Sequence, residues 1–102
     1  MSLTINWQPP QLQLQGDLTT DEVTRHWPVP QAWLTVPVLT LDLSQLAQID
    51  SAGLAWLLEL ESLQRRANGT LEWHHCPERL QQLMTLYDLS LKQQRLEAKN
   101  NA

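Results

Sequence analysis

The sequence has few cysteines, basic residues and long apolar runs, and each shortage excludes a class of protein. Cys76 is the single cysteine in 102 residues, so no disulfide can form within the chain, and a reducing compartment is expected. Seven Lys and Arg against eleven Asp and Glu give a net charge of −4, which argues against a nucleic-acid surface. No run approaches the ~20 apolar residues that cross a bilayer, and the first residues do not resemble an export signal. We therefore expect a soluble, non-exported domain.

Catalytic and metal sites also lack their usual patterns. The three glycines, Gly16, Gly53 and Gly69, stand far apart and form no phosphate-binding loop. Ser51 has no G-x-S-x-G context. In a predicted strand, His74 and Cys76 would share a face and offer two ligands, whereas structural zinc takes four. We therefore expect no enzyme activity, no metal and no cofactor.

What remains is the pattern of one α/β domain. Apolar residues make up 42% of the chain, with five Trp and no Phe. Alternating and helical periods predict two strands, a short helix, a strand, a helix, a strand and a helix, at 3–7, 11–16, 19–27, 38–43, 51–67, 70–76 and 78–89. Thr19 and Glu22 match a capping box for the first helix, and a further helical turn is expected within 31–37. The domain is expected to span 1–91, followed by a polar tail at 92–102.

The stretch 38–58 organises the rest of the chain. Val38 to Leu43 is nearly continuously apolar, which predicts a strand buried on both faces, and a connection is expected at 44–49. Asp50 and Ser51 then stand directly before an apolar helix, where a side-chain oxygen commonly caps the first turn.

On the predicted helix, one stripe should face the sheet, formed by Trp56 or Leu57, Leu60, Leu63 and Ala67. Leu54 and Leu58 widen the apolar surface beside Asp50 and Ser51. That extra width suits either a docking surface or deeper burial of the first turns, and the pattern alone leaves both readings open.

The letters L-D-L-S-x-L-x-x-I-D-S-A-G-L from Leu41 to Leu54 resemble the signature of STAS domains, which include anti-sigma factor antagonists and sulfate-transporter tails. The resemblance implies a STAS fold, with a mixed sheet of about four strands and helices packed mainly on one face. It also implies that the loop at the start of the central helix docks a partner ATPase or kinase. The partner-binding residues implied are Asp50, Ser51, Ala52, Gly53 and Leu54.

One position separates the branches of that family. Anti-sigma factor antagonists usually read D-S-S-G or D-S-T-G and carry their phosphate on the hydroxyl before Gly, where this chain has Ala52. The remaining hydroxyl, a possible regulatory one, is Ser51. The MlaB branch is similar in this respect, and residues 83–89 resemble its closing helix.

The resemblance to that branch implies a non-catalytic subunit that binds and stabilises or activates the ATP-binding subunit of an Mla-type phospholipid ABC transporter. Such a transporter includes a permease subunit and maintains outer-membrane lipid asymmetry. The implied location is cytoplasmic, peripheral to the inner membrane through the complex. The alternative is an anti-sigma factor antagonist that binds a serine kinase, and Ala52 argues against it. Without the resemblance, Asp-Ser before a helix would be read as a structural cap.

Overall fold

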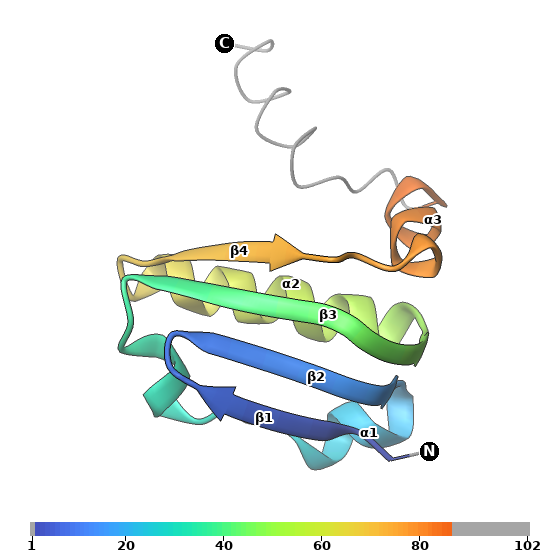
Figure 1. The fold of residues 1–102 in the computed structure, drawn as a ribbon, viewed down its shortest axis with the longest axis horizontal. Helices are drawn as coiled ribbons and strands as arrows, with labels where there is room; N and C mark the ends of the chain where they lie inside the picture. Colours follow the sequence, from blue (N-terminus) through green and yellow to red (C-terminus); the bar gives the residue numbers. More distant parts are fainter. Residues whose placement is uncertain (1, 87–102) are drawn as a thin grey trace, which may run out of the picture.

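A mixed four-stranded sheet forms the frame of the protein, in the order β1-β2-β3-β4 (Figure 1). The structure is a computed structural model, and it describes residues 2–86. β1 and β2 are antiparallel, whereas β2–β3 and β3–β4 are parallel. The elements in chain order are β1 Thr4–Gln8, β2 Gln11–Leu18, α1 Thr20–Arg25, the 3-10 turn η1 Gln31–Leu34, β3 Val38–Ile49, α2 Ser51–Arg66, β4 Thr70–His74 and α3 Glu78–Leu86.

The helices α1 and α2 lie on the same face of this sheet, behind it in Figure 1. The core fills the space between the sheet and these helices, with Leu12, Leu14, Leu39, Leu41 and Leu57 all fully buried. The expected mixed sheet of about four strands with helices mainly on one face is therefore confirmed.

The other face of the sheet is polar, and here one expectation was wrong. β3 was predicted to be buried on both faces, but only Leu39, Leu41 and Leu43 are fully buried. Between them, the Asp42 carboxylate accepts hydrogen bonds from the side-chain amides of Gln11 (3.3 Å) and Gln13 (3.2 Å). Alternate residues of a strand point to opposite faces, and on the face away from the helices these polar side chains meet each other.

β3 is also longer than predicted, because the expected connection at 44–49 is strand. Its second half pairs with the end of β2, from Gln15↔Gln45 to Leu18↔Ile49, with irregular register between the paired segments. Pairing to a neighbouring strand overrides the weak strand preference of this segment. As a result, β3 runs directly into Asp50, and the sheet itself places that residue.

The buried face of α2 departs from the predicted stripe in its second half. Leu57 and Leu60 are buried as expected, but Leu63 is half-buried and Ala67 is exposed. Gln64 takes the inner position instead, fully buried, and its Nε2 donates to the carbonyls of Val36 (2.8 Å) and Thr70 (3.2 Å). This polar residue is buried because it satisfies one carbonyl in the loop before β3 and one at the start of β4.

The predicted capping box at the start of α1 does not form. Thr19 is the N-cap residue, but its side chain makes no cap hydrogen bond. Glu22 is buried, and its carboxylate accepts from the Leu3 amide (2.7 Å) and from the Arg25 guanidinium (2.9 Å). The Glu22 carboxylate, which a capping box would have bonded to the backbone of Thr19, instead bonds to the distant Leu3 amide.

The final strand and helix differ from the prediction at their ends. β4 stops at His74, because His75 adopts a positive φ of 58°, so the shared strand face expected for His74 and Cys76 does not exist. In α3, Leu80 and Leu83 are buried as the helical period predicts. The predicted helix at 87–89 and the polar tail at 92–102 lie outside the described residues.

Candidate functional site: the junction of two helix starts

The carboxylate of Asp50 lies where α1 and α2 both begin. Asp50 is the N-cap of α2, and its Oδ1 accepts the amide of Gly53 at 2.9 Å. Its Oδ2 accepts the amide of Thr20 at 3.0 Å and the hydroxyl of Thr20 at 3.1 Å. One side chain therefore serves free N–H groups in the first turns of two helices.

The sheet explains why the two helix starts meet. β2 and β3 are parallel, and their last residues, Leu18 and Ile49, are paired. Each strand passes almost directly into a helix at this end of the sheet, and the Asp50 amide donates to the Leu18 carbonyl at 3.3 Å. The junction is consequently fixed by the same pairing that lengthens β3.

The environment of Asp50 favours its charged form. Partial burial by itself raises the pKa of Asp50, but the hydrogen bonds from the Gly53, Thr20 and Ala52 amides and from the Thr20 hydroxyl outweigh it. The pKa of Asp50 therefore lies below its ordinary value. The junction carries a negative charge at neutral pH, and the positive ends of two helix dipoles face it.

Ser51 and Ala52 are the predicted site residues that the junction presents outward. Ser51 is the first residue of α2 and is exposed, and Ala52 is half-buried. Within residues 2–86, the Ser51 hydroxyl has no hydrogen-bond partner, because Asp50 caps the helix. Ser51 is therefore free to contact a partner.

Gly53 and Leu54 lie inside the domain. Leu54 is 2% exposed and belongs to the core, so the apolar width predicted at this position is turned inward. A Cβ built on Gly53 would collide with the Leu18 carbonyl oxygen and would lie only 3.0 Å from a side-chain carbon of Ile49. These two residues can support a contact by holding the junction in place, and the chain needs glycine at 53 because β2 passes so close.

Comparison with known families gives the same assignment as the motif. The chain matches the family model described as "Mlab, STAS domain" over residues 1–94. It belongs to this STAS family. No curated protein matches the sequence. Among the helices within residues 2–86, none is long and apolar enough to span a membrane.

Two solved structures resemble the STAS domain weakly. One, described as a crystal structure of Mglu, matches 74% of this chain at 17% identity and a TM-score of 0.49, and this chain spans 20% of that protein. The other is an uncharacterised DUF3478-family protein with a SpoIIAA-like fold from Shewanella loihica PV-4. It covers 72% of this chain and 84% of its own, at 16% identity and a TM-score of 0.40. Neither likeness bears on function.

Thr20 is the junction residue that the sequence did not indicate. Its amide and hydroxyl both bond to Asp50, thirty residues away, and no local spacing connects the two positions. The one available signal was that Thr20 and Asp50 both lie where a predicted strand is followed by a predicted helix, and the ends of parallel strands meet at the same edge of a sheet.

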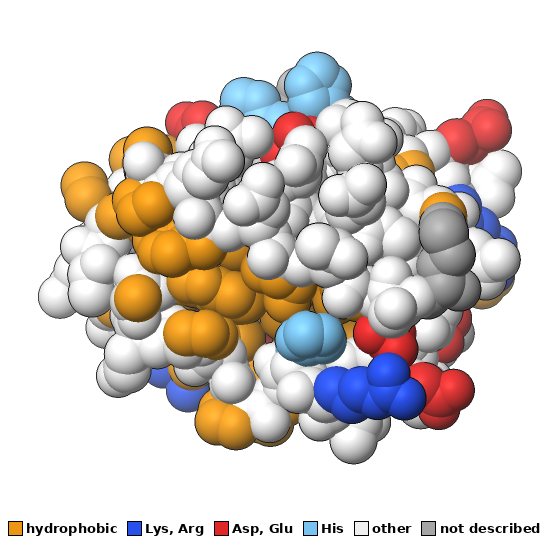
Figure 2. All heavy atoms as spheres, turned by 60° about the horizontal axis from the view of Figure 1, so that its bottom comes forward, with side chains coloured by type: hydrophobic (Ala, Val, Ile, Leu, Met, Phe, Trp, Pro, Cys, Tyr) orange, Lys and Arg blue, Asp and Glu red, His pale blue; other side chains and the backbone are white. Residues whose placement is uncertain are grey.

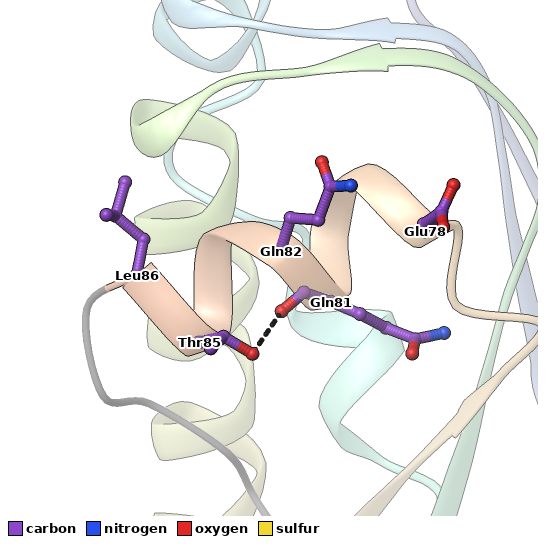
Figure 3. A pocket seen from close by; sticks show the side chains of 5 residues that line it. All are labelled: Glu78, Gln81, Gln82, Thr85 and Leu86. Atoms are coloured by element: carbon purple, nitrogen blue, oxygen red, sulfur yellow. Dashed lines mark hydrogen bonds between the residues drawn. The ribbon is translucent and has the colours of Figure 1, made fainter.

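A shallow hollow along α3 is a second candidate site. Glu78, Gln81, Gln82, Thr85 and Leu86 line it (Figure 3). The Thr85 hydroxyl donates to the backbone carbonyl of Gln81 at 3.0 Å, as is usual one turn along a helix. The lining brings no cluster of reactive groups together, and the junction at Asp50 remains the better candidate.

Replacing Gly53 with alanine should destabilise the STAS domain, against the usual trend in helices. Alanine is favoured over glycine inside a helix by roughly 1 kcal/mol. At this position the added methyl group meets the backbone of β2, which cannot move aside as a flexible side chain could. Forcing extra volume into a packed site costs about 1–3 kcal/mol, so we expect a net loss of up to about 2 kcal/mol in the free energy of unfolding.

Thermal unfolding followed by circular dichroism measures this change. The matched control is Ala55→Gly, an exposed position of the same helix, which should lower stability by the propensity difference alone. A Gly53→Ala protein that melts above the wild type would show that β2 leaves room for the methyl group.

Proposed function

We propose that this STAS domain is a non-catalytic subunit that binds the ATP-binding subunit of an Mla-type phospholipid ABC transporter and stabilises or activates it. The observation that carries the proposal is the start of α2, where Asp50 caps the helix, Ser51 is exposed and Ala52 is half-buried. The chain that carries it belongs to the MlaB-type family. The protein would then be cytoplasmic and would reach the inner membrane through the transporter complex.

The chemistry of the junction suits docking to another protein. Asp50 accepts hydrogen bonds from the Gly53 and Thr20 amides, so the start of α2 is already ordered before a partner binds. The Ser51 hydroxyl can both donate and accept a hydrogen bond. Ser51 and Ala52 are small, and a partner's backbone or side chain can approach α2 closely there. A preorganised contact of this kind loses little conformational entropy on binding.

Ala52 supports the transporter branch over the alternative. An anti-sigma factor antagonist of the usual pattern is switched by phosphate on the residue before glycine, and Ala52 has no hydroxyl to accept one. The Ser51 hydroxyl has no histidine or carboxylate hydrogen-bonded to it within residues 2–86, so the arrangement described also offers no activated nucleophile. Binding is the function that these residues support best.

Co-expression with an Mla-type ATP-binding subunit from the same organism tests the proposal. We expect the STAS domain to co-purify with the ATP-binding subunit, and we expect that subunit to be more stable or more active in the complex than alone. The isolated STAS domain should hydrolyse no nucleotide. Intrinsic ATPase activity of the pure chain, or stable capture of a serine kinase in place of the ABC subunit, would contradict the proposal.

A further inference from the structure

β1 forms one edge of the sheet, and its outer backbone groups are free. The Pro10 carbonyl accepts the Thr40 amide of β3 at 2.9 Å, and alternate residues of a strand direct their backbone groups to opposite sides. Gln11, Gln13 and Gln15 therefore bond to Gln8, Asn6 and Thr4 of β1, with which they are paired. By the same alternation, Ile5 and Trp7 direct their N–H and C=O groups away from β2, where no residue within 2–86 bonds to them.

The surroundings of Ile5 and Trp7 on this edge are apolar and uncharged. Residues 1–16 and 26–41 contain no Asp, Glu, Lys or Arg. Trp27 is 46% exposed, and the core continues outward into half-buried side chains, Ile5, Trp7, Val29, Leu34 and Val36. Figure 2 shows hydrophobic side chains gathered on this side of the molecule, with the charged side chains lying outside the cluster. We call the Trp27, Val29, Leu34 and Val36 side chains the tryptophan flank.

We propose that β1 is a dimerisation edge, on which the β1 strand of a second copy of this chain pairs antiparallel about a two-fold axis at Asn6. In this register Asn6 faces Asn6 of the second copy, and Ile5 faces its Trp7. The outward N–H and C=O groups of both facing pairs match, which gives four hydrogen bonds between strands. Ile5 and Trp7 also share the helix-side face, because they are paired with the buried Leu14 and Leu12, so their side chains pack across the axis.

The charge distribution favours a second copy at this edge. Each chain carries a net charge of −4, so two copies repel one another except where the approaching surfaces are uncharged. Such a surface flanks Ile5 and Trp7, whereas the Glu22 carboxylate that holds the Leu3 amide is paired with Arg25. The two-fold axis stands perpendicular to the joined sheets and places both helix layers on one side, where the two tryptophan flanks come together.

The edge is limited to a short pairing, which gives a closed dimer. On one side of Ile5 and Trp7 the Leu3 amide is already bonded to Glu22, and on the other side Pro9 has no amide to donate. Strand pairing with a second copy therefore cannot extend far beyond Ile5 and Trp7. The opposite edge strand, β4, exposes Glu72 and His74, and charged residues on an edge discourage further strand addition. The proposal does not depend on the proposed ATPase contact, which uses Asp50 and α2.

The first test is sedimentation equilibrium of the full chain across a concentration series. We expect the average mass to rise from one chain to two. Asn6→Lys, an exposed change that brings two ammonium groups together at the axis, should weaken the dimer at least about tenfold. Thr70→Lys, which adds the same charge on the exposed face of β4, should leave it unchanged. A wild-type chain that stays monomeric throughout, or a dimer indifferent to Asn6→Lys, would overturn the proposal.

The second test fixes the register. In a Cys76→Ala background, Asn6→Cys should crosslink two chains on mild oxidation, because facing residues of this kind lie about 4.5 Å apart at Cα, within disulfide range. Thr4→Cys should not, since Thr4 faces Gln8 of the second copy. Equal crosslinking of both variants would contradict the proposed register. If the tryptophan flank became buried only when the ATP-binding subunit or lipid vesicles were added, a partner other than a second copy would occupy this edge, and the proposal would be overturned.

Discussion

Replacing Asp50 with alanine is expected to lower the free energy of unfolding by about 2–4 kcal/mol. The substitution removes an N-cap, worth about 1 kcal/mol, and two further hydrogen bonds from Thr20 to a charged acceptor, which are worth more than neutral ones. The Thr20 hydrogen bonds are exposed to solvent, so the expected loss of stability is smaller than the sum of these individual contributions. Because one carboxylate holds both helix starts, α1 and α2 should lose stability together.

Two neighbouring variants separate the roles of the two carboxylate oxygens. Asp50→Asn keeps a neutral oxygen for the Gly53 amide but turns its NH2 group, a donor, toward Thr20. Its stability should fall between those of wild type and Asp50→Ala. Ser51→Ala should change stability by less than about 0.5 kcal/mol, because the Ser51 side chain is exposed and unbonded within residues 2–86. Chemical denaturation of the four proteins gives the order. A larger loss for Ser51→Ala than for Asp50→Ala would mean that the serine is the cap.

The same carboxylate should make stability depend on acidic pH. The folded-state pKa of Asp50 lies below its ordinary value, so Asp50 stabilises the fold fully at pH values above the unfolded-state pKa of about 4. That contribution is lost as the pH falls through the lower, folded-state pKa. The difference in stability between wild type and Asp50→Asn should accordingly shrink below about pH 4.

Much of the fold could be predicted from local pattern. Leu12 and Leu14 alternate with glutamines and lie inward, and Pro9-Pro10 ends β1 where a turn is needed. Asp50 before an apolar run was expected to start a helix, and it does so through its own side chain. In each case the residues that decide the structure lie within a few positions of one another.

The predictions failed where distant residues decide the structure. The Glu22 carboxylate accepts a hydrogen bond from the distant Leu3 amide and does not cap the start of its own helix. Gln64 is buried because the Val36 carbonyl, from the loop before β3, and the Thr70 carbonyl, from the start of β4, meet there. Residues 44–49 become strand because β2 lies beside them. Within the site, Thr20 joins Asp50 for the same reason, and Leu54 turns inward because α2 packs on the sheet.

These contacts shape the proposed docking centre. Of the five residues that the family motif indicates, Asp50 and Gly53 hold the helix start against β2, and Leu54 anchors it in the core. Ser51 and Ala52 remain for a partner. The proposed contact is therefore small, rigid and centred on one unbonded hydroxyl, and it should be sensitive to charge and to size at Ser51.

Ser51→Glu should have the largest effect on binding with little effect on folding. On the isolated domain, an anion in the first turn of α2 is tolerated, or favoured by about 0.3–1 kcal/mol, because it suits the helix dipole. In a packed interface, the same carboxylate loses its water without gaining a partner. An unpaired buried charge costs about 3–5 kcal/mol, which corresponds to a loss of several hundredfold or more in affinity.

The affinity of the ATP-binding subunit for wild type and Ser51→Glu, measured by titration calorimetry, is the most direct test of the proposed docking centre. Thr70→Glu is the control, since Thr70 is paired with Val38 at the far end of β3 from Asp50. We predict that the free energy of unfolding of Ser51→Glu lies within about 1 kcal/mol of the wild-type value, yet that this variant no longer binds the ATP-binding subunit. Thr70→Glu should bind it as wild type does. A folded Ser51→Glu protein that binds the ATP-binding subunit as tightly as wild type would contradict the assignment.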